Sequence, residues 1–318
     1  MAYTYETFRF LLNKICMSIP HESILLSGGL DSSILMFYIH PEYAITITID
    51  DSSSDFRYST LLADRFETKH VITYPDKKAI FEGLNELISD YKTFDPIFIR
   101  NAVIQLIGIK RANELRCNSV IVGDGADELF GGYNFLHKYE NDSTVIQSKL
   151  MQLTQNMDFV SIKMAEKYHM TVFTPFLDKE IIKFAETLDV KEKINKHNGI
   201  IYGKFFLRKC FRDVLGDEIV WRKKEALEYG SGISQFILTF EGELSDQEFL
   251  EGSNIARYEG VSIRNKEHLY YYQIYRKHFN APMNDPSNQC LAYRKCSFCS
   301  CSVTWQGSFC KVCGSYPI

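Results

Sequence analysis

The sequence predicts an α/β protein with a doubly wound parallel sheet, a helical second half and a small cysteine-rich C-terminal module. Short apolar runs alternate with helical patterns as far as Tyr133, which is typical of a parallel sheet with helical crossovers. From residue 145 to 240 the apolar residues follow helical periodicity instead. Six of the nine cysteines lie between Cys290 and Cys313. These three observations divide the chain into a sheet-forming part, a helical part and a terminal module.

The first part of the chain begins with a helix, because Phe8, Leu11, Leu12 and Ile15 recur at helical spacing. Four apolar runs then predict strands, and helical patterns separate them, the first of which is an apolar helix over 34–39. The strands are expected at 23–26, 43–49, 69–73 and 119–122, and the helices at 6–17, 56–66, 77–91 and 97–115.

No strand is expected after Tyr133, where the pattern favours helices that cover the sheet. An acidic, poorly patterned segment predicts a loop, and a segment with two prolines predicts a linker. The helices are expected at 145–167, 179–188, 202–214 and 266–279, the loop at 241–254 and the linker at 281–288. The domains are accordingly expected at 1–280 and 290–318, with a linker over 281–289.

A glycine-rich turn between the first strand and the next helix predicts a site for phosphate. The turn reads Leu26-Ser27-Gly28-Gly29-Leu30-Asp31-Ser32-Ser33. Adjacent glycines let the backbone approach an anion, which the helix N-terminus and the serine hydroxyls then bind. No lysine follows, so the turn is not a Walker A loop. Asp31 would repel phosphate unless Mg²⁺ lay between the two.

A second loop, after the strand at 119–122, is acidic. It reads Gly123-Asp124-Gly125-Ala126-Asp127-Glu128. Strand ends line the ligand crevice of an open α/β sheet, so these carboxylates are expected to face the same ligand as Asp31. Such a cluster suits Mg²⁺ between phosphates, with one carboxylate left to accept a proton.

The first loop resembles the PP-loop of ATP pyrophosphatases, and with the acidic loop the chain resembles the synthetase domain of asparagine synthetase and β-lactam synthetase. Three further segments carry the resemblance, which extends from about residue 5 to 240. They are Thr93-Phe94-Asp95-Pro96 with Ile99-Arg100, then Thr174-Pro175-Phe176-Leu177-Asp178, then Trp221-Arg222-Lys223-Lys224-Glu225 with Gly230 and Gly232.

The resemblance implies an adenine nucleotide α-hydrolase (PP-loop) fold and an amide ligase that forms AMP and pyrophosphate. By the same resemblance Asp31 and Asp127 hold Mg²⁺ and Lys224 contacts the α-phosphate. Arg100 and the loop over 50–55 are the residues expected to contact the acceptor carboxylate. Asp124 stands where asparagine synthetases carry a glutamate that helps to deprotonate the amine, and is one methylene shorter. The implied nucleotide-binding residues are Leu26, Ser27, Gly28, Gly29, Asp31, Ser32, Ser33, Ile49, Gly123 and Asp127.

The nitrogen donor is left open. Glutamine-dependent members of the family carry an N-terminal glutaminase whose nucleophile is a cysteine after Met1, but Ala2 follows Met1 here. The expected donors are therefore free ammonia, a separate glutaminase subunit or an amine on the substrate. The partners expected are a small-molecule carboxylate and that ammonia or amine.

The clustered cysteines predict a structural zinc ribbon. Cys296-x2-Cys299 and Cys310-x2-Cys313 have the spacing of two knuckles around one tetrahedral Zn²⁺. Cys290 and Cys301 are further thiols that could replace one of the four. Disulfides and a redox pair are the alternatives to zinc.

Composition and net charge narrow the classes of partner that this protein is expected to bind. The net charge of −4 and pI near 6.1 argue against a general polyanion binder. No signal peptide and no membrane span are evident, so a cytoplasmic protein is expected. The alternatives are a PP-loop enzyme that modifies tRNA, with Arg294, Lys295 and Lys311 making the ribbon locally basic, and a nucleotide-binding scaffold without activity. The oligomeric state stays open, with a homodimer as one alternative.

Overall fold

The computed structural model describes residues 4–242, 244–285, 294–303 and 308–317. The chain forms two compact units, one of residues 1–74 with 108–226 and one of residues 75–107 with 227–318. The ribbon cysteines and residues 75–107 belong to the same unit. The expected linker over 281–289 reaches beyond the described residues, and the domain boundaries at 280 and 290 stay a prediction.

The first unit contains a parallel sheet of five strands in the order β3-β2-β1-β4-β5. The predicted α/β class with a doubly wound parallel sheet is therefore confirmed. β1 and β4 are neighbours although β2 and β3 come between them in sequence, and Ile24 pairs with Ile121. The loops after β1 and β4 thus leave the sheet at its topological switch point, where such sheets bind ligands. The strands are β1 Ser23–Leu25, β2 Tyr43–Ile47, β3 Lys69–Thr73, β4 Ser119–Ile121 and β5 Thr171–Phe173.

Helices of the first unit pack on this sheet and on one another around a continuous apolar core. Phe8 of the first helix is fully buried and contacts the rings of Phe130, Phe184 and Phe206. The helices are α1 Tyr5–Cys16, α2 Leu30–Ile39, α3 Ser54–Arg65, α6 Ala126–Phe130, α7 Ser143–Gln155, α8 Val160–Lys167, α9 Lys179–Thr187, α10 Val190–Lys193, α11 Phe205–Cys210, α12 Arg212–Leu215 and α13 Asp217–Val220. Helix α5, Pro96–Glu114, begins in the second unit and ends in the first.

The expectation of no strand after Tyr133 is wrong. β5 completes the sheet beside β4, and β6 (Asn195–His197) and β7 (Ile200–Tyr202) form an antiparallel hairpin. All three are only three residues long, too short for a period to be read. The helix expected over 145–167 is likewise two helices, α7 and α8, and that over 202–214 is replaced by the end of β7 followed by α11 and α12.

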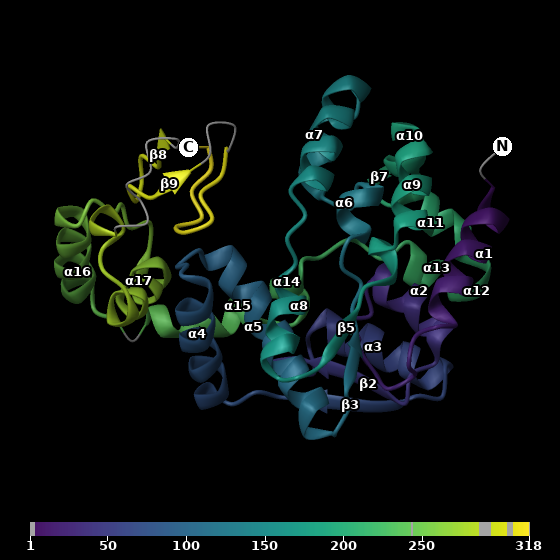
Figure 1. Ribbon diagram of the computed structural model, residues 1–318, viewed down its shortest axis with the longest axis horizontal. Helices are drawn as coiled ribbons and strands as arrows, with labels where there is room; N and C mark the ends of the chain where they lie inside the picture. The colour runs from purple at the N-terminus through teal and green to yellow at the C-terminus, as the bar shows by residue number, and fades with distance from the viewer. Residues whose placement is uncertain (1–3, 243, 286–293, 304–307, 318) are drawn as a thin grey trace. The chain divides into compact units, whose positions relative to one another are not determined.

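The second unit is helical, apart from the pair of short strands that begins the cysteine-rich module (Figure 1). α4 packs against α17, whose aromatic residues Tyr271, Tyr272 and Tyr275 are buried. The elements are α4 Lys77–Tyr91, α14 Leu227–Gly230, α15 Ile233–Glu241, α16 Asp246–Tyr258, α17 Lys266–His278, β8 Arg294–Lys295 and β9 Ser302–Val303.

The prediction of a loop over 241–254 is wrong, because α16 (Asp246–Tyr258) begins within this segment. Ser245 and Glu248 form a capping box: the Ser245 hydroxyl accepts from the Glu248 amide, and the Glu248 carboxylate accepts from the Ser245 amide. This start signal outweighs the poor apolar pattern of the helix. Among the described residues, no helix is both long and apolar enough to cross a bilayer.

Candidate active site and metal centre

The glycine-rich turn joins β1 to the N-terminus of α2, as the sequence predicts. Gly29 caps the helix, and its carbonyl accepts from the hydroxyls of Ser32 and Ser33 at 3.1 and 2.7 Å. The Ser27 hydroxyl accepts from the Gly29 amide at 3.2 Å. The first-turn amides of α2 have no partner within the helix, so the turn offers N–H donors to an anion.

Two glycines of the predicted nucleotide site are required by close packing. Gly28 has φ +66°, and a Cβ there would lie 2.6 Å from the backbone carbon of Tyr58 in α3. A Cβ on Gly123 would lie 2.8 Å from Cβ of Asp31. The acidic loop after β4 therefore lies directly against the phosphate loop after β1, which brings the predicted residues of both loops into one site.

Arg222 links the phosphate loop to the start of α3. Its Nη1 donates to the Ser27 carbonyl at 3.0 Å, and its Nη2 donates to Oδ1 of Asp55 at 2.9 Å. Burial raises the pKa of Asp55 to about 6, although the Arg222 guanidinium acts in the opposite direction. The guanidinium also lies over the Tyr58 ring, 4.3 Å from its centroid. Arg222 thus connects the backbone of the phosphate loop with α3.

A network of two carboxylates and two ammonium groups lies at the switch point. Lys204 Nζ is 2.5 Å from Oδ2 of Asp31 and 2.6 Å from Oδ1 of Asp127. Lys224 Nζ donates to Oδ2 of Asp127 at 2.9 Å. Burial raises the pKa of Asp127, but the two ammonium groups outweigh this effect and lower it well below its ordinary value. Burial lowers the pKa of Lys224, and the Asp127 and Asp31 carboxylates more than reverse that shift.

Paired glycines let Lys204 reach these carboxylates. A Cβ on Gly203 would lie 2.1 Å from the Gly131 carbonyl oxygen, and one on Gly132 would lie 1.8 Å from Oδ1 of Asp127 and 2.3 Å from Cε of Lys204. The chain after β7 therefore crosses the chain after α6 at van der Waals contact. Lys204 itself has φ +54° and donates its amide to the Phe130 carbonyl at 3.0 Å.

Asp124 lies in the same loop but has a different partner. The hydroxyl of Ser161, a buried residue of α8, donates to Oδ2 of Asp124 at 2.5 Å. Burial raises the pKa of Asp124 to about 6, the Ser161 hydrogen bond opposes this shift, and Glu128, Asp127 and Asp31 add to it by repulsion. A carboxyl group with this pKa is deprotonated near neutrality and still basic enough to accept a proton.

The contacts of the remaining predicted site residues do not test the roles expected of them. Leu26 is buried and donates its amide to Ile45, whereas Ile49 is half-buried just after β2. Arg100 belongs to the second unit, where its Nε lies 2.5 Å from Oε2 of Glu228 and its Nη1 lies 3.5 Å from Oε2 of Glu267. The roles assigned to these residues stay predictions.

Two residues of the site were not predicted from the sequence. Lys204 follows a hairpin that the sequence did not reveal, and only its place directly after Gly203 marks it. Ser161 is one of many serines, and nothing local connects it with Asp124. Both reach the site through tertiary packing alone.

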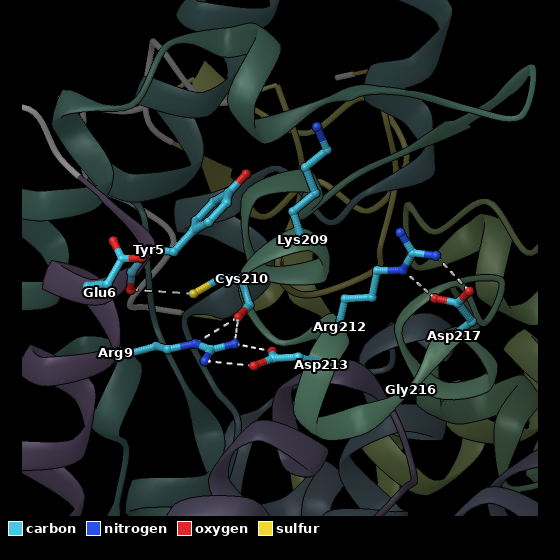
Figure 2. Close-up of a pocket in the computed structure, with 9 residues that line it drawn as sticks. All are labelled: Tyr5, Glu6, Arg9, Lys209, Cys210, Arg212, Asp213, Gly216 and Asp217. Carbon is cyan, nitrogen blue, oxygen red and sulfur yellow. Dashed lines mark hydrogen bonds and ion pairs between the residues drawn. The ribbon is translucent and has the colours of Figure 1, made fainter.

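A separate pocket in the first unit carries no predicted site residue (Figure 2). Two ion pairs line it, Arg9 with Asp213 and Arg212 with Asp217, the latter at 2.6 Å. Because these charges neutralise one another, the pocket presents little net charge to a ligand. The residues that line it are Tyr5, Glu6, Arg9, Lys209, Cys210, Arg212, Asp213, Gly216 and Asp217.

The four cysteines of the predicted zinc ribbon lie together in the second unit. The sulfurs of Cys296, Cys299, Cys310 and Cys313 all lie within 4.8 Å of one another and are buried. The Sγ atoms of Cys299 and Cys310 are 3.6 Å apart, and those of Cys296 and Cys313 are 3.8 Å apart. Tetrahedral Zn²⁺ with bonds of 2.3 Å separates its sulfurs by about 3.8 Å. The set therefore fits Zn²⁺; Cys290 lies outside the described residues.

Comparison with known proteins supports the resemblance to asparagine synthetases that the sequence motifs indicate. The family model described as asparagine synthase matches residues 16–169 and 143–290. Asparagine synthetase [glutamine-hydrolyzing] 1 of Lotus japonicus is 27% identical over 303 residues, which are 88% of this chain and 51% of that protein. Asparagine synthetase B [glutamine-hydrolyzing] of Escherichia coli K12 is 25% identical over 94% of this chain and 57% of its own length.

The chain therefore belongs to the asparagine synthase family, and the resemblance in the sequence is confirmed. It spans about half the length of the curated relatives that it matches. Among solved structures, the predicted subunit of a tRNA methyltransferase from Methanocaldococcus jannaschii covers 53% of this chain at 16% identity. The TM-score of 0.30 is too low for that likeness to bear on function.

Proposed function

We propose that this protein is an ATP-dependent amide ligase that adenylates a small carboxylate and transfers the acyl group to ammonia or an amine. The observation that carries the proposal is the network of Asp31, Asp127, Lys204 and Lys224 between the loops after β1 and β4. Family membership supports the same reaction class, in which ATP is cleaved to AMP and pyrophosphate.

The charges of this network suit the departure of pyrophosphate. The first-turn amides of α2 and the serine hydroxyls of the phosphate loop would bind the β- and γ-phosphates. Lys204 and Lys224 would carry positive charge to the oxygens on which negative charge grows as the α–β bond breaks. Groups already aimed at developing charge lower the barrier most effectively.

Asp31 and Asp127 would also hold Mg²⁺. Among the described residues no hydrogen bond reaches Oδ1 of Asp31, although that oxygen is buried. A buried carboxylate oxygen without a hydrogen bond is a suitable ligand for a hard divalent cation. When bound, Mg²⁺ would neutralise charge on the pyrophosphate.

The reaction would proceed in two steps, adenylation and acyl transfer. An oxygen of the acceptor carboxylate attacks the α-phosphorus and pyrophosphate leaves, giving an acyl adenylate. The lone pair of ammonia or an amine then attacks the acyl carbon, and AMP leaves as the amide forms. Asp124 would accept the proton that the nitrogen loses, for which its pKa of about 6 is suited.

Aspartate with ammonia is the first pair to test, because the relatives compared above are asparagine synthetases. Purified protein would be supplied with ATP, Mg²⁺ and a panel of amino acids, with and without ammonia, and pyrophosphate and AMP would be measured. Release of ADP and phosphate would exclude the proposed reaction class. AMP formed only with added tRNA would instead support an RNA-modifying enzyme.

Two substitutions test the phosphate site itself. Asp31→Asn and Asp127→Asn are expected to abolish pyrophosphate release while the circular dichroism spectrum stays native. Asp64→Asn on α3 is the matched control, since Asp64 is exposed. Ordinary activity in Asp31→Asn would exclude this site.

A further inference from the structure

The tetracysteine ribbon is built from two similar turns. The carbonyl of Cys296 accepts from the Ser300 amide at 2.9 Å, and that of Cys310 accepts from the Gly314 amide at 2.9 Å. Ser300 and Gly314, each directly after the second cysteine of its pair, have φ of +62° and +71°. Each turn thus aims two sulfurs at one point, which leaves its outer backbone free to contact the rest of the second unit.

The second turn pairs with the segment just before α5. The Phe94 amide donates to the Val312 carbonyl at 2.7 Å. The Thr93 hydroxyl donates to the carbonyls of Lys311 and Val312, at 2.8 and 3.1 Å. Thr93 and Phe94 are both buried, so these bonds are shielded from water.

The same turn contacts the cap of α5. The Asp95 carboxylate accepts from the Ile97 amide at 3.1 Å and so caps this helix. A Cβ on Gly314 would lie 2.1 Å from that carboxylate, so only glycine fits there. Arg264, between α16 and α17, donates to the carbonyls of Gly314 and Cys313 at 2.9 and 2.7 Å.

The held segment leads directly to Arg100. Arg100 follows Asp95 on the first turns of α5, and its ion pairs with Glu228 and Glu267 lie within the second unit. Glu228 follows Lys224 by four residues in the sequence. The orientation of Arg100 therefore depends on where the cap of α5 is fixed, and the ribbon fixes that cap.

We propose that the zinc ribbon is an internal brace for residues 93–100, which it holds through backbone carbonyls at the second cysteine turn. The ribbon is then a part of the ligase fold that positions Arg100, and not a separate module for binding another macromolecule. The positioning of the segment is independent of the proposed function, and only its effect on turnover depends on it.

The first test uses the full chain with and without metal. Elemental analysis is expected to find about one zinc per chain. After zinc is extracted with a chelator, hydrogen exchange at Phe94 and along 97–100 is expected to rise about 5- to 30-fold, the effect of losing one or two hydrogen bonds. Exchange in β1 and β4 of the first unit should stay unchanged.

The second test leaves the cysteines intact. Thr93→Val and Arg264→Met remove the side chains that contact the second turn but no predicted zinc ligand. Both variants are expected to keep their zinc and to show faster exchange over 93–100. Arg257→Met on α16 is the matched control, because Arg257 is exposed.

Hydrogen exchange tests the brace, whereas turnover tests the proposed reaction. Faster exchange over 93–100 with no ligase activity in any sample would support the brace and contradict the proposed function. Unchanged exchange over 93–100, both in the metal-free protein and in Thr93→Val, would overturn the brace. If the metal-free protein unfolds entirely, hydrogen exchange over 93–100 in Thr93→Val and Arg264→Met decides whether the ribbon acts as a brace.

Discussion

The Lys204 ammonium lies 2.5 Å from Oδ2 of Asp31, and only 3% of the Lys204 side chain is exposed. Because Asp127 lies on its other side, one buried cation separates two carboxylates that would otherwise repel each other. This arrangement gives Lys204 an effect on stability that can be measured without any substrate.

Lys204→Met is expected to lower the free energy of unfolding by about 3–5 kcal/mol in magnesium-free buffer, since it removes the ammonium partner of Asp31 and leaves Asp127 with Lys224 alone. Added Mg²⁺ should restore part of the loss. Urea unfolding measures both effects, with the exposed Lys191→Met as control. Equal stability of Lys204→Met and Lys191→Met would show that the ion pairs contribute nothing.

Protonation of Asp124 is expected to limit the activity at low pH. Because burial raises its pKa to about 6, kcat/KM should fall as the pH drops through 6 and Asp124 gains a proton. The Ser161 hydrogen bond lowers that pKa, so Ser161→Ala should move the limit to higher pH and Ser161→Cys should move it less. An unchanged limit in Ser161→Ala would mean that Ser161 only packs.

The same pKa predicts a pH-dependent stability. A raised pKa in the folded state means that Asp124 favours folding below about pH 4 and loses this contribution as the pH rises through 6. Asp124→Asn should therefore gain about 2–3 kcal/mol relative to the parent between pH 4 and pH 8. A constant difference between the two proteins across this range would contradict the assignment.

Lys224→Ala is expected to lower kcat about 10²- to 10³-fold and to change ATP affinity much less, because charge on the α-phosphate grows mainly in the transition state. Single-turnover kinetics and equilibrium nucleotide binding separate the two effects. The exposed neighbour in Lys223→Ala serves as control. Equal losses in rate and affinity would make Lys224 a ground-state phosphate contact.

Gly28→Ala and Gly199→Ala form a matched pair, since both glycines have positive φ. Nothing lies within 4 Å of a Cβ on Gly199, whereas one on Gly28 meets the backbone of Tyr58. We expect Gly199→Ala to lose about 1–2 kcal/mol of unfolding free energy and Gly28→Ala about 2–4 kcal/mol, together with nucleotide binding. Thermal unfolding and nucleotide titration provide the comparison, and equal losses would place Gly28 outside any tight contact.

The sequence predicts the first three strands well because their apolar runs alternate with clear helical patterns. β3 and α4 agree with their expected ranges to the residue. Both loops of the candidate site can be singled out in the sequence because their residues are consecutive. β5 was missed since its three residues have no readable period, and Lys204 and Ser161 were missed since they meet the loops only through packing. The ribbon cysteines were recognised by spacing, but their contact with Thr93 and Phe94 depends on backbone carbonyls, which any residue carries.

The crossing of Gly203 over Gly131 also has a consequence during synthesis on the ribosome. Asp31 and Asp127 are translated before Lys204, and at about 5–20 residues per second several seconds pass before Lys204 follows. During that interval a nascent chain that folds the sheet early holds the two carboxylates against each other without their cation. The ion pairs of Lys204 with Asp31 and Asp127 can therefore form only after the hairpin of β6 and β7 and the lysine that follows it have left the ribosome.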